Sequence, residues 1–167
     1  ANGIKVYIYS ELMPTPMLSW AVRELKCQAG IVITASHNPA KYNGYKVYGE
    51  DGCQITLDVA NTVIGKINAV EMFGGAKVMD FEDGIKSGKI EYIKQDVIDK
   101  YLDKVAQQGV HTDLVADSGL KVVYTPLNGT GNKPVRAILK KIGIKEVTVV
   151  PEQENPDGNF PTCPFPN

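Results

Sequence analysis

Apolar residues recur along this chain at two spacings, one typical of strands and one typical of helices. Short apolar runs predict strands at residues 4–9, 30–34, 45–48, 121–124 and 146–150. Apolar residues at intervals of three and four predict helices that begin at residue 15 and that cover residues 57–70, 95–107 and 133–142. Because strands and helices alternate, the pattern predicts an α/β protein.

Capping residues indicate where the first predicted helix begins. Thr15 and Pro16 have the residue types of a helix N-cap and a first helical position. The first two predicted strands flank this helix, and a parallel pairing between them would need a right-handed crossover. We therefore expect a strand, helix, strand unit that ends just before Ser36.

The boundary between two units is expected near residue 92. Residues 77–92 are ambiguous, because the turn signals Asp83-Gly84 and Ser87-Gly88 lie among short apolar groups. The amphipathic pattern that follows begins a new unit. We therefore predict two α/β domains, at residues 1–92 and 93–167.

The bulk composition is that of an ordinary globular protein. The 167 residues are 43% apolar and 22% charged, with a net charge of −1, so nothing indicates a nucleic-acid or membrane surface. The apolar runs are far shorter than the roughly 20 residues that span a bilayer, and no charged-then-apolar leader precedes them. We expect a cytoplasmic protein. The missing initiator methionine and the turn-rich last residues suggest a piece of something longer.

The cysteines give no sign of a disulfide framework or a zinc site. Cys27, Cys53 and Cys163 are odd in number and widely spaced, and they form no C-x-x-C pair. We interpret them as reduced thiols without a catalytic role.

The richest chemistry follows the predicted strand at residues 30–34. Ser36, His37 and Asn38 come where that strand ends, and loops at the carboxyl ends of strands are where α/β folds usually bind ligands. The turn at Asn43-Gly44 then brings the chain back to Lys46. A hydroxyl, an imidazole, a carboxamide and an ammonium group together suit phosphate.

Less specific interpretations of these residues stay open. Serine often satisfies backbone groups in turns, and Lys46 could be a solvated strand lysine. A serine hydrolase is a poor explanation, because the G-x-S-x-G motif is missing and His37, the immediate neighbour of Ser36, is an unsuitable base for it. His111, in a loop after a helix, suggests no role.

A second glycine loop, Asn128-Gly129-Thr130-Gly131, joins a predicted strand to a predicted helix. A dinucleotide site is one interpretation, with Glu152 as the ribose-binding acid. The G-x-G-x-x-G pattern fails, however, because Pro134 stands where its third glycine would be. A tight structural turn is the favoured interpretation.

Residues 34–39, Thr-Ala-Ser-His-Asn-Pro, followed by Asn43-Gly44-Tyr45-Lys46, resemble the active-site serine loop of the α-D-phosphohexomutases, the phosphoglucomutase and phosphomannomutase group. Thr15-Pro16 and residues 125–131 and 157–161 extend the resemblance over nearly the whole chain. The Thr-Pro-Leu-x-Gly-Thr-Gly form of residues 125–131 favours the phosphoglucomutase or phosphopentomutase branch. The resemblance implies two partial α/β domains with mixed sheets layered by helices, as in the first two of the family's four domains.

The resemblance also implies a reaction and the residues for it. Ser36 matches the serine that carries a phosphoryl group, which passes to a hexose phosphate, glucose phosphate in the first instance, and gives a bisphosphate intermediate. Lys46 is implied for charge stabilisation or acid–base work, and His37 for orienting the phosphoryl oxygens or the substrate. Asn38 is implied for phosphate binding and for holding the loop.

The family's metal site is incomplete in this sequence. The resemblance implies Mg²⁺ bound through the phosphate on Ser36 and through a D-x-D-x-D loop, a motif that does not occur here. Hexose 1,6-bisphosphate is the implied activator. We expect the chain alone to be inactive and to self-associate through exposed sheet edges. A noncatalytic phosphate-binding or interaction module is the alternative.

Overall fold

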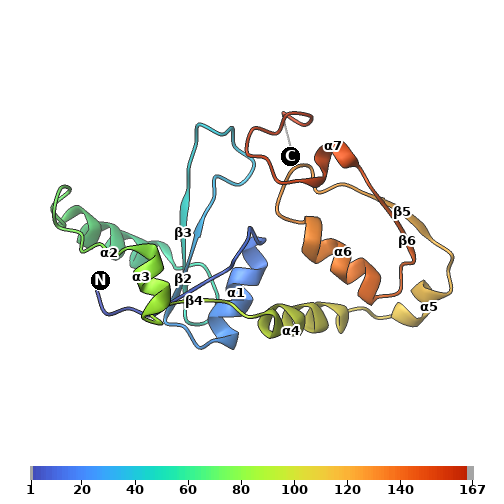
Figure 1. The fold of residues 1–167 in the computed structure, drawn as a ribbon, viewed down its shortest axis with the longest axis horizontal. Helices are drawn as coiled ribbons and strands as arrows, with labels where there is room; N and C mark the ends of the chain where they lie inside the picture. The colour runs from blue at the N-terminus through green and yellow to red at the C-terminus, as the bar shows by residue number, and fades with distance from the viewer. Residues whose placement is uncertain (1, 165–167) are drawn as a thin grey trace.

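The computed structural model describes residues 2–164, which form two lobes with a helix between them (Figure 1). The first lobe contains β1 (Val6–Ile8), α1 (Thr15–Glu24), β2 (Ala29–Ile33), β3 (Tyr45–Gly49), α2 (Leu57–Asn68), α3 (Phe81–Lys86) and β4 (Ile90–Tyr92). Helix α4 (Gln95–Ala106) runs from this lobe to the second. The second lobe contains α5 (Thr112–Ala116), β5 (Lys121–Tyr124), α6 (Asn132–Lys141), β6 (Glu146–Val149) and α7 (Pro151–Glu154).

The predicted α/β class is confirmed, and the described strands form three separate two-stranded ladders. Strands β1 and β4 are parallel, β2 and β3 are antiparallel, and β5 and β6 are parallel. A parallel pair of the first two strands is not among these ladders. Strand β2 pairs instead with β3, which follows it closely along the chain, and β1 pairs with the more distant β4.

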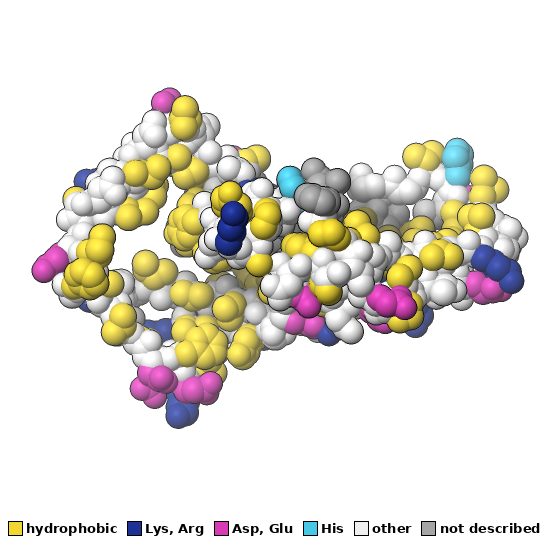
Figure 2. All heavy atoms as spheres, turned by 90° about the horizontal axis from the view of Figure 1, so that it is seen from above, with side chains coloured by type: hydrophobic (Ala, Val, Ile, Leu, Met, Phe, Trp, Pro, Cys, Tyr) yellow, Lys and Arg dark blue, Asp and Glu magenta, His cyan; other side chains and the backbone are white. Residues whose placement is uncertain are grey.

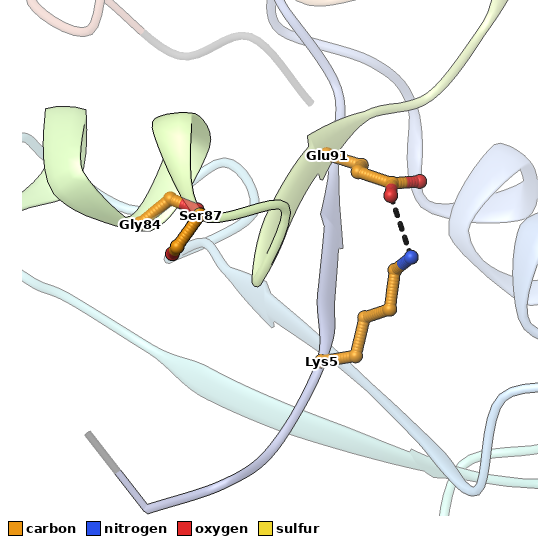
Figure 3. A network of polar contacts seen from close by, with 4 residues as sticks. All are labelled: Lys5, Gly84, Ser87 and Glu91. Atoms are coloured by element: carbon orange, nitrogen blue, oxygen red, sulfur yellow. Dashed lines mark hydrogen bonds and ion pairs between the residues drawn. The ribbon is translucent and has the colours of Figure 1, made fainter.

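An exposed ion pair and close helix packing accompany the pairing of β1 with β4. The Nζ atom of Lys5 lies 2.5 Å from an Oε1 atom of Glu91 across this ladder (Figure 3). Helix α3 packs on the same ladder so closely that a Cβ atom at Gly84 would lie 2.5 Å from Cδ1 of Ile90. The ambiguous stretch thus contains a helix and a strand, and Gly84 lies inside the helix rather than in a turn. The hydroxyl of Ser87 donates to the carbonyl of Gly84, 3.1 Å away, near the helix end.

Helix α1 begins at Thr15 as predicted, but its N-cap lies one residue earlier than the sequence suggests. The N-cap is Pro14 rather than Thr15, because the carbonyl of Pro14 already accepts the amide N–H of Met17 at 2.9 Å. Pro16 still lies in the first turn, where the missing amide proton costs no hydrogen bond.

The core lies where α1, α4 and α6 meet. Met17, Ala21 and Val22 of α1 are buried, as are Val97 and Leu102 of α4. Helix α4 contacts both α1 and α6, so it belongs to the packing of both lobes.

Polar contacts support the same junction. The indole Nε1 of Trp20 donates to the carbonyl of Val97 at 3.1 Å, and its ring lies 6.1 Å from that of Tyr101. Lys133 of α6 forms an ion pair with Glu11 of the first lobe. The two lobes are therefore joined by a helical core with an ion pair at its surface.

Helix α2 has the predicted amphipathic sequence, yet none of its described residues is buried. Val59, Ile64 and Ile67 are each about half exposed, at 48%, 52% and 54%. Apolar side chains are correspondingly spread over the surface of the first lobe in Figure 2. No helix in residues 2–164 combines the length and the apolar character needed to cross a membrane.

Candidate functional site

The hairpin of β2 and β3 carries the loop of residues 34–44, which we call the serine loop. In this ladder Val32 is opposite Lys46 and Ile33 is opposite Tyr45. The amide of Thr34 donates to the carbonyl of Gly44 at 3.0 Å and closes the base of the loop. The backbones approach so closely here that a Cβ atom at residue 44 would lie 1.9 Å from the Thr34 carbonyl oxygen, so only glycine fits.

Ser36 has an unusual backbone and an exposed side chain. Its φ is +59°, in the left-handed region that residues with side chains rarely adopt. Its amide donates to Oγ1 of Thr34 at 2.9 Å, a local hydrogen bond that holds this conformation. Ser36 is therefore presented to solvent by a turn rather than packed against the fold.

The Ser36 hydroxyl contacts the neighbouring imidazole. Ser36 Oγ lies 3.1 Å from His37 Nδ1. In the tautomer that carries its proton on Nε2, Nδ1 accepts the hydroxyl proton, which leaves the lone pairs of Oγ exposed. Both side chains are open to solvent, so a phosphate on Ser36 would be accessible to a second molecule.

The rest of the serine loop is shaped by backbone hydrogen bonds. The amide of Asn38 donates to the carbonyl of Ala35 at 3.1 Å, and the amide of Tyr42 donates to the carbonyl of Pro39 at 2.9 Å. The side chain of Asn38 is exposed. Its backbone thus closes a turn while its carboxamide is free to meet a ligand.

Lys46 lies on the ladder that supports the loop. Lys46 is directly opposite Val32, so the two side chains lie on the same face of the ladder. Thr34, two residues after Val32, lies on that face too and is the diagonal neighbour of Lys46. Its side chain is half-buried. In the described part of the chain, no hydrogen bond or ion pair joins Lys46 to Ser36, so the structure brings Ser36 and His37 together and leaves Lys46 beside the base of the loop.

The second glycine loop, residues 125–131, has a buried asparagine at its centre, and we call it the asparagine loop. Asn128 is only 5% exposed. Its Nδ2 donates to the carbonyls of Glu152 and Asn155 at 3.3 and 3.0 Å, and its backbone bonds both Gln153 and Asp157. This loop ties β5 to the segment after β6, which supports the structural-turn interpretation.

The described residues do not form the metal site that the resemblance implies. Among residues 2–164, no group of three or more His, Cys, Asp or Glu side chains could hold a metal ion. Ser36 offers a single oxygen, which cannot hold Mg²⁺ without further ligands.

Two residues of the serine loop acquire roles that sequence reasoning did not give them. Thr34 supplies the oxygen that binds the Ser36 amide, and Gly44 permits the close approach at the loop base. The signal for Thr34 was a threonine at the strand end two residues before the serine, a spacing typical of a side-chain-to-backbone turn.

Comparison with known proteins agrees with the fold. The model of the phosphoglucomutase/phosphomannomutase alpha/beta/alpha domain I matches residues 1–73, and that of domain II matches residues 99–167. The solved structure of a phosphoglucomutase/phosphomannomutase family protein from Burkholderia thailandensis shares the fold, with a TM-score of 0.62 and 24% identity. That superposition covers 96% of this chain and 32% of the other.

Two of the similar proteins are named as mutases. A phosphoribomutase of Saccharomyces cerevisiae is 38% identical over 99% of this chain and 29% of its own length. A phosphoglucomutase of Staphylococcus saprophyticus is 37% identical over 99% of this chain and 30% of its own length. The chain thus spans less than a third of these relatives. With two successive domain models matched, it belongs to the α-D-phosphohexomutase family, the family of the phosphoglucomutases and phosphomannomutases.

Proposed function

We propose that the protein containing this chain is a phosphosugar mutase that interconverts hexose 1-phosphate and hexose 6-phosphate, with glucose phosphates as the first substrates to assay. Ser36 would carry the transferred phosphoryl group. The observation that carries the proposal is the exposed Ser36 hydroxyl, held by a left-handed turn at the end of β2. The relatives named as mutases support it.

The reaction would use these groups in a balanced exchange. The bond between phosphorus and Ser36 Oγ breaks as a sugar hydroxyl attacks, and the proton of that hydroxyl ends on Ser36 Oγ, which gives a hexose 1,6-bisphosphate and an unmodified serine. After the bisphosphate turns around, Ser36 Oγ takes the other phosphoryl group, and the serine proton ends on the sugar oxygen that is released. Such transfers depend mainly on positioning and charge stabilisation.

The neighbouring side chains suit those two tasks. His37, in contact with Ser36 Oγ, would orient phosphoryl oxygens, and Asn38 would contribute its exposed carboxamide. Lys46 would stabilise negative charge or transfer a proton, reaching the phosphate from the adjoining face of the ladder.

The proposed protein is a cytoplasmic enzyme in which this chain forms two domains. We place the domain boundary between residues 92 and 93, because β4 ends at Tyr92 and pairs with β1 while α4 begins at Gln95. We place the protein in the cytoplasm and its substrate among small phosphosugars, without nucleic-acid or membrane partners. Mg²⁺ would need ligands beyond those that residues 2–164 provide.

Phosphopeptide mapping tests the proposal. The full-length protein, purified without phosphatase, should carry phosphate on Ser36. Phosphate on Thr34 with none on Ser36 would defeat the assignment. The 167-residue chain alone should show no turnover of glucose 1-phosphate, even with Mg²⁺ and glucose 1,6-bisphosphate, because groups that orient the substrate are missing. Turnover near an ordinary rate, roughly 10 per second, would contradict it.

A noncatalytic phosphate-binding or interaction module is the second candidate. It is favoured by one observation: the side chains of Ser36, His37 and Asn38 are all exposed, so they could bind a phosphate without transferring it. The full-length reading frame separates the two. An aspartate-rich D-x-D-x-D loop downstream would favour the enzyme, and a natural stop after Asn167 would favour the module.

A further inference from the structure

The Ser36 backbone is held by one side chain. Thr34 Oγ1 accepts the Ser36 amide at 2.9 Å, and Ser36 adopts a φ of +59°. A left-handed conformation is disfavoured for a residue with a Cβ atom, so it needs local support. Among the described residues, this is the hydrogen bond made by the Ser36 amide.

Thr34 is itself firmly placed. Its amide is bonded to the carbonyl of Gly44 at 3.0 Å, and its side chain is half-buried at the end of the β2–β3 ladder. Threonine is branched at Cβ, so few rotamers are open to it. The position of its Oγ1 is therefore set by the ladder, and the Ser36 backbone is set by that oxygen.

The same turn occurs in the asparagine loop, where no phosphate chemistry is proposed. Thr125 Oγ1 accepts the amide of Leu127 at 3.0 Å, and Leu127 has a φ of +51°. In both loops a threonine at a strand end holds the residue two positions later in the left-handed region. A serine in one loop and a leucine in the other thus adopt the same conformation after the same threonine.

We propose that Thr34 is a positioning residue for phosphoryl transfer at Ser36, acting by fixing the direction in which Ser36 Oγ leaves the loop. The inference rests on the proposed function. Without the Thr34 hydroxyl, Ser36 would keep its nucleophile but sample other backbone conformations. The reacting oxygen would then spend less time in line with the substrate, which slows the chemical step without weakening substrate binding.

The test compares Thr34→Val with Thr34→Ser in the full-length protein, assayed with glucose 1-phosphate. Valine keeps the branched shape and removes the oxygen, whereas serine keeps the oxygen. We expect Thr34→Val to lower kcat about tenfold, the order expected for one hydrogen bond, with KM within about twofold. Thr34→Ser should restore most of kcat. Thr34→Ala serves as a second variant without the oxygen.

Thr125→Val is the matched control. Thr125 makes the same turn and also donates from Oγ1 to Gln153 Oε1 at 2.7 Å, so its loss should lower the melting temperature and leave kcat of the folded protein within about twofold. Equal kcat for wild type and Thr34→Val, or a Thr34→Ser variant as slow as Thr34→Val, would overturn the positioning role alone. A wild-type protein without phosphate on Ser36 would overturn the proposed function and this inference together.

Discussion

The serine loop and the asparagine loop begin with the same threonine turn and then use their side chains in opposite ways. In the asparagine loop, buried Asn128 bonds the backbone of a segment about 25 residues away along the chain. In the serine loop, Ser36, His37 and Asn38 are all exposed, and the hydrogen bonds of the loop are local.

This difference separates structure from chemistry. Buried polar groups whose hydrogen bonds are all made hold segments together. Removing one of them leaves its partners buried without a hydrogen bond, which lowers the free energy of unfolding. Exposed groups on a fixed turn contribute little stability and keep their donors and acceptors for a ligand. We therefore expect changes in the asparagine loop to affect mainly stability, and changes in the serine loop to affect mainly activity.

The largest expected effect is at Ser36. Ser36→Ala in the full-length protein should bring mutase turnover to background, because the phosphoryl acceptor is removed. The melting temperature should stay within about 1 °C, because the side chain is exposed. Coupled spectrophotometric assay and calorimetry measure the two. Turnover that persists in the Ser36→Ala variant would show that another residue carries the phosphoryl group.

A large effect on rate is also expected at Lys46. Lys46→Met should slow the full-length enzyme by about 100- to 1000-fold, since a cation beside a transferring phosphoryl group stabilises developing charge. Its melting temperature should barely move, because the described contacts of Lys46 include no ion pair. Lys41→Met, a change at an exposed lysine of the serine loop, is the control. Equal rates for both variants and the wild type would make Lys46 a solvated strand lysine.

The asparagine loop should show the reverse behaviour. Asn128→Ala should lower the free energy of unfolding by about 2–4 kcal/mol, because the carbonyls of Glu152 and Asn155 lose their donor. Urea denaturation of the 167-residue chain measures it. Asn128→Gly separates the lost bonds from backbone strain, since φ is +56° here and glycine tolerates it. Asn38→Ala should change stability by less than about 0.5 kcal/mol, and a cost equal to that of Asn128→Ala would break the comparison.

A smaller effect should arise in the first lobe away from both loops. Burial, with a lesser contribution from Tyr101, raises the pKa of Tyr9 to about 12, and its hydroxyl donates to the Met17 carbonyl at 2.9 Å. Because the folded state favours the neutral phenol, Tyr9 contributes to the free energy of unfolding below pH 10, and this contribution is lost as pH rises through 12. The loss should be about 1–2 kcal/mol after partial exposure is allowed for. Tyr9→Phe should flatten this part of the pH profile, and an unchanged slope would assign it elsewhere.

The local patterns of the sequence determined most of the elements. Helical spacing predicted the start of α1, and it predicted α2, α4 and α6 to within two residues at both ends. The residue types at 34–46 were enough to single out Ser36 and its loop, because a turn, a strand end and reactive groups coincide within a short stretch. Such features depend on neighbours in sequence, which is why they can be predicted from sequence alone.

Only the tertiary structure decided which strands pair and which polar groups are buried. Strand β1 pairs with β4, more than 80 residues away, and not with β2, and this pairing depends on contacts between segments that are distant in sequence, such as the Lys5–Glu91 ion pair. Likewise, Thr34 and Thr125 make the same local turn, yet exposure of one loop and burial of the other depend on whether a distant segment returns to cover it. The sequence determined the turns, and long-range packing decided their use.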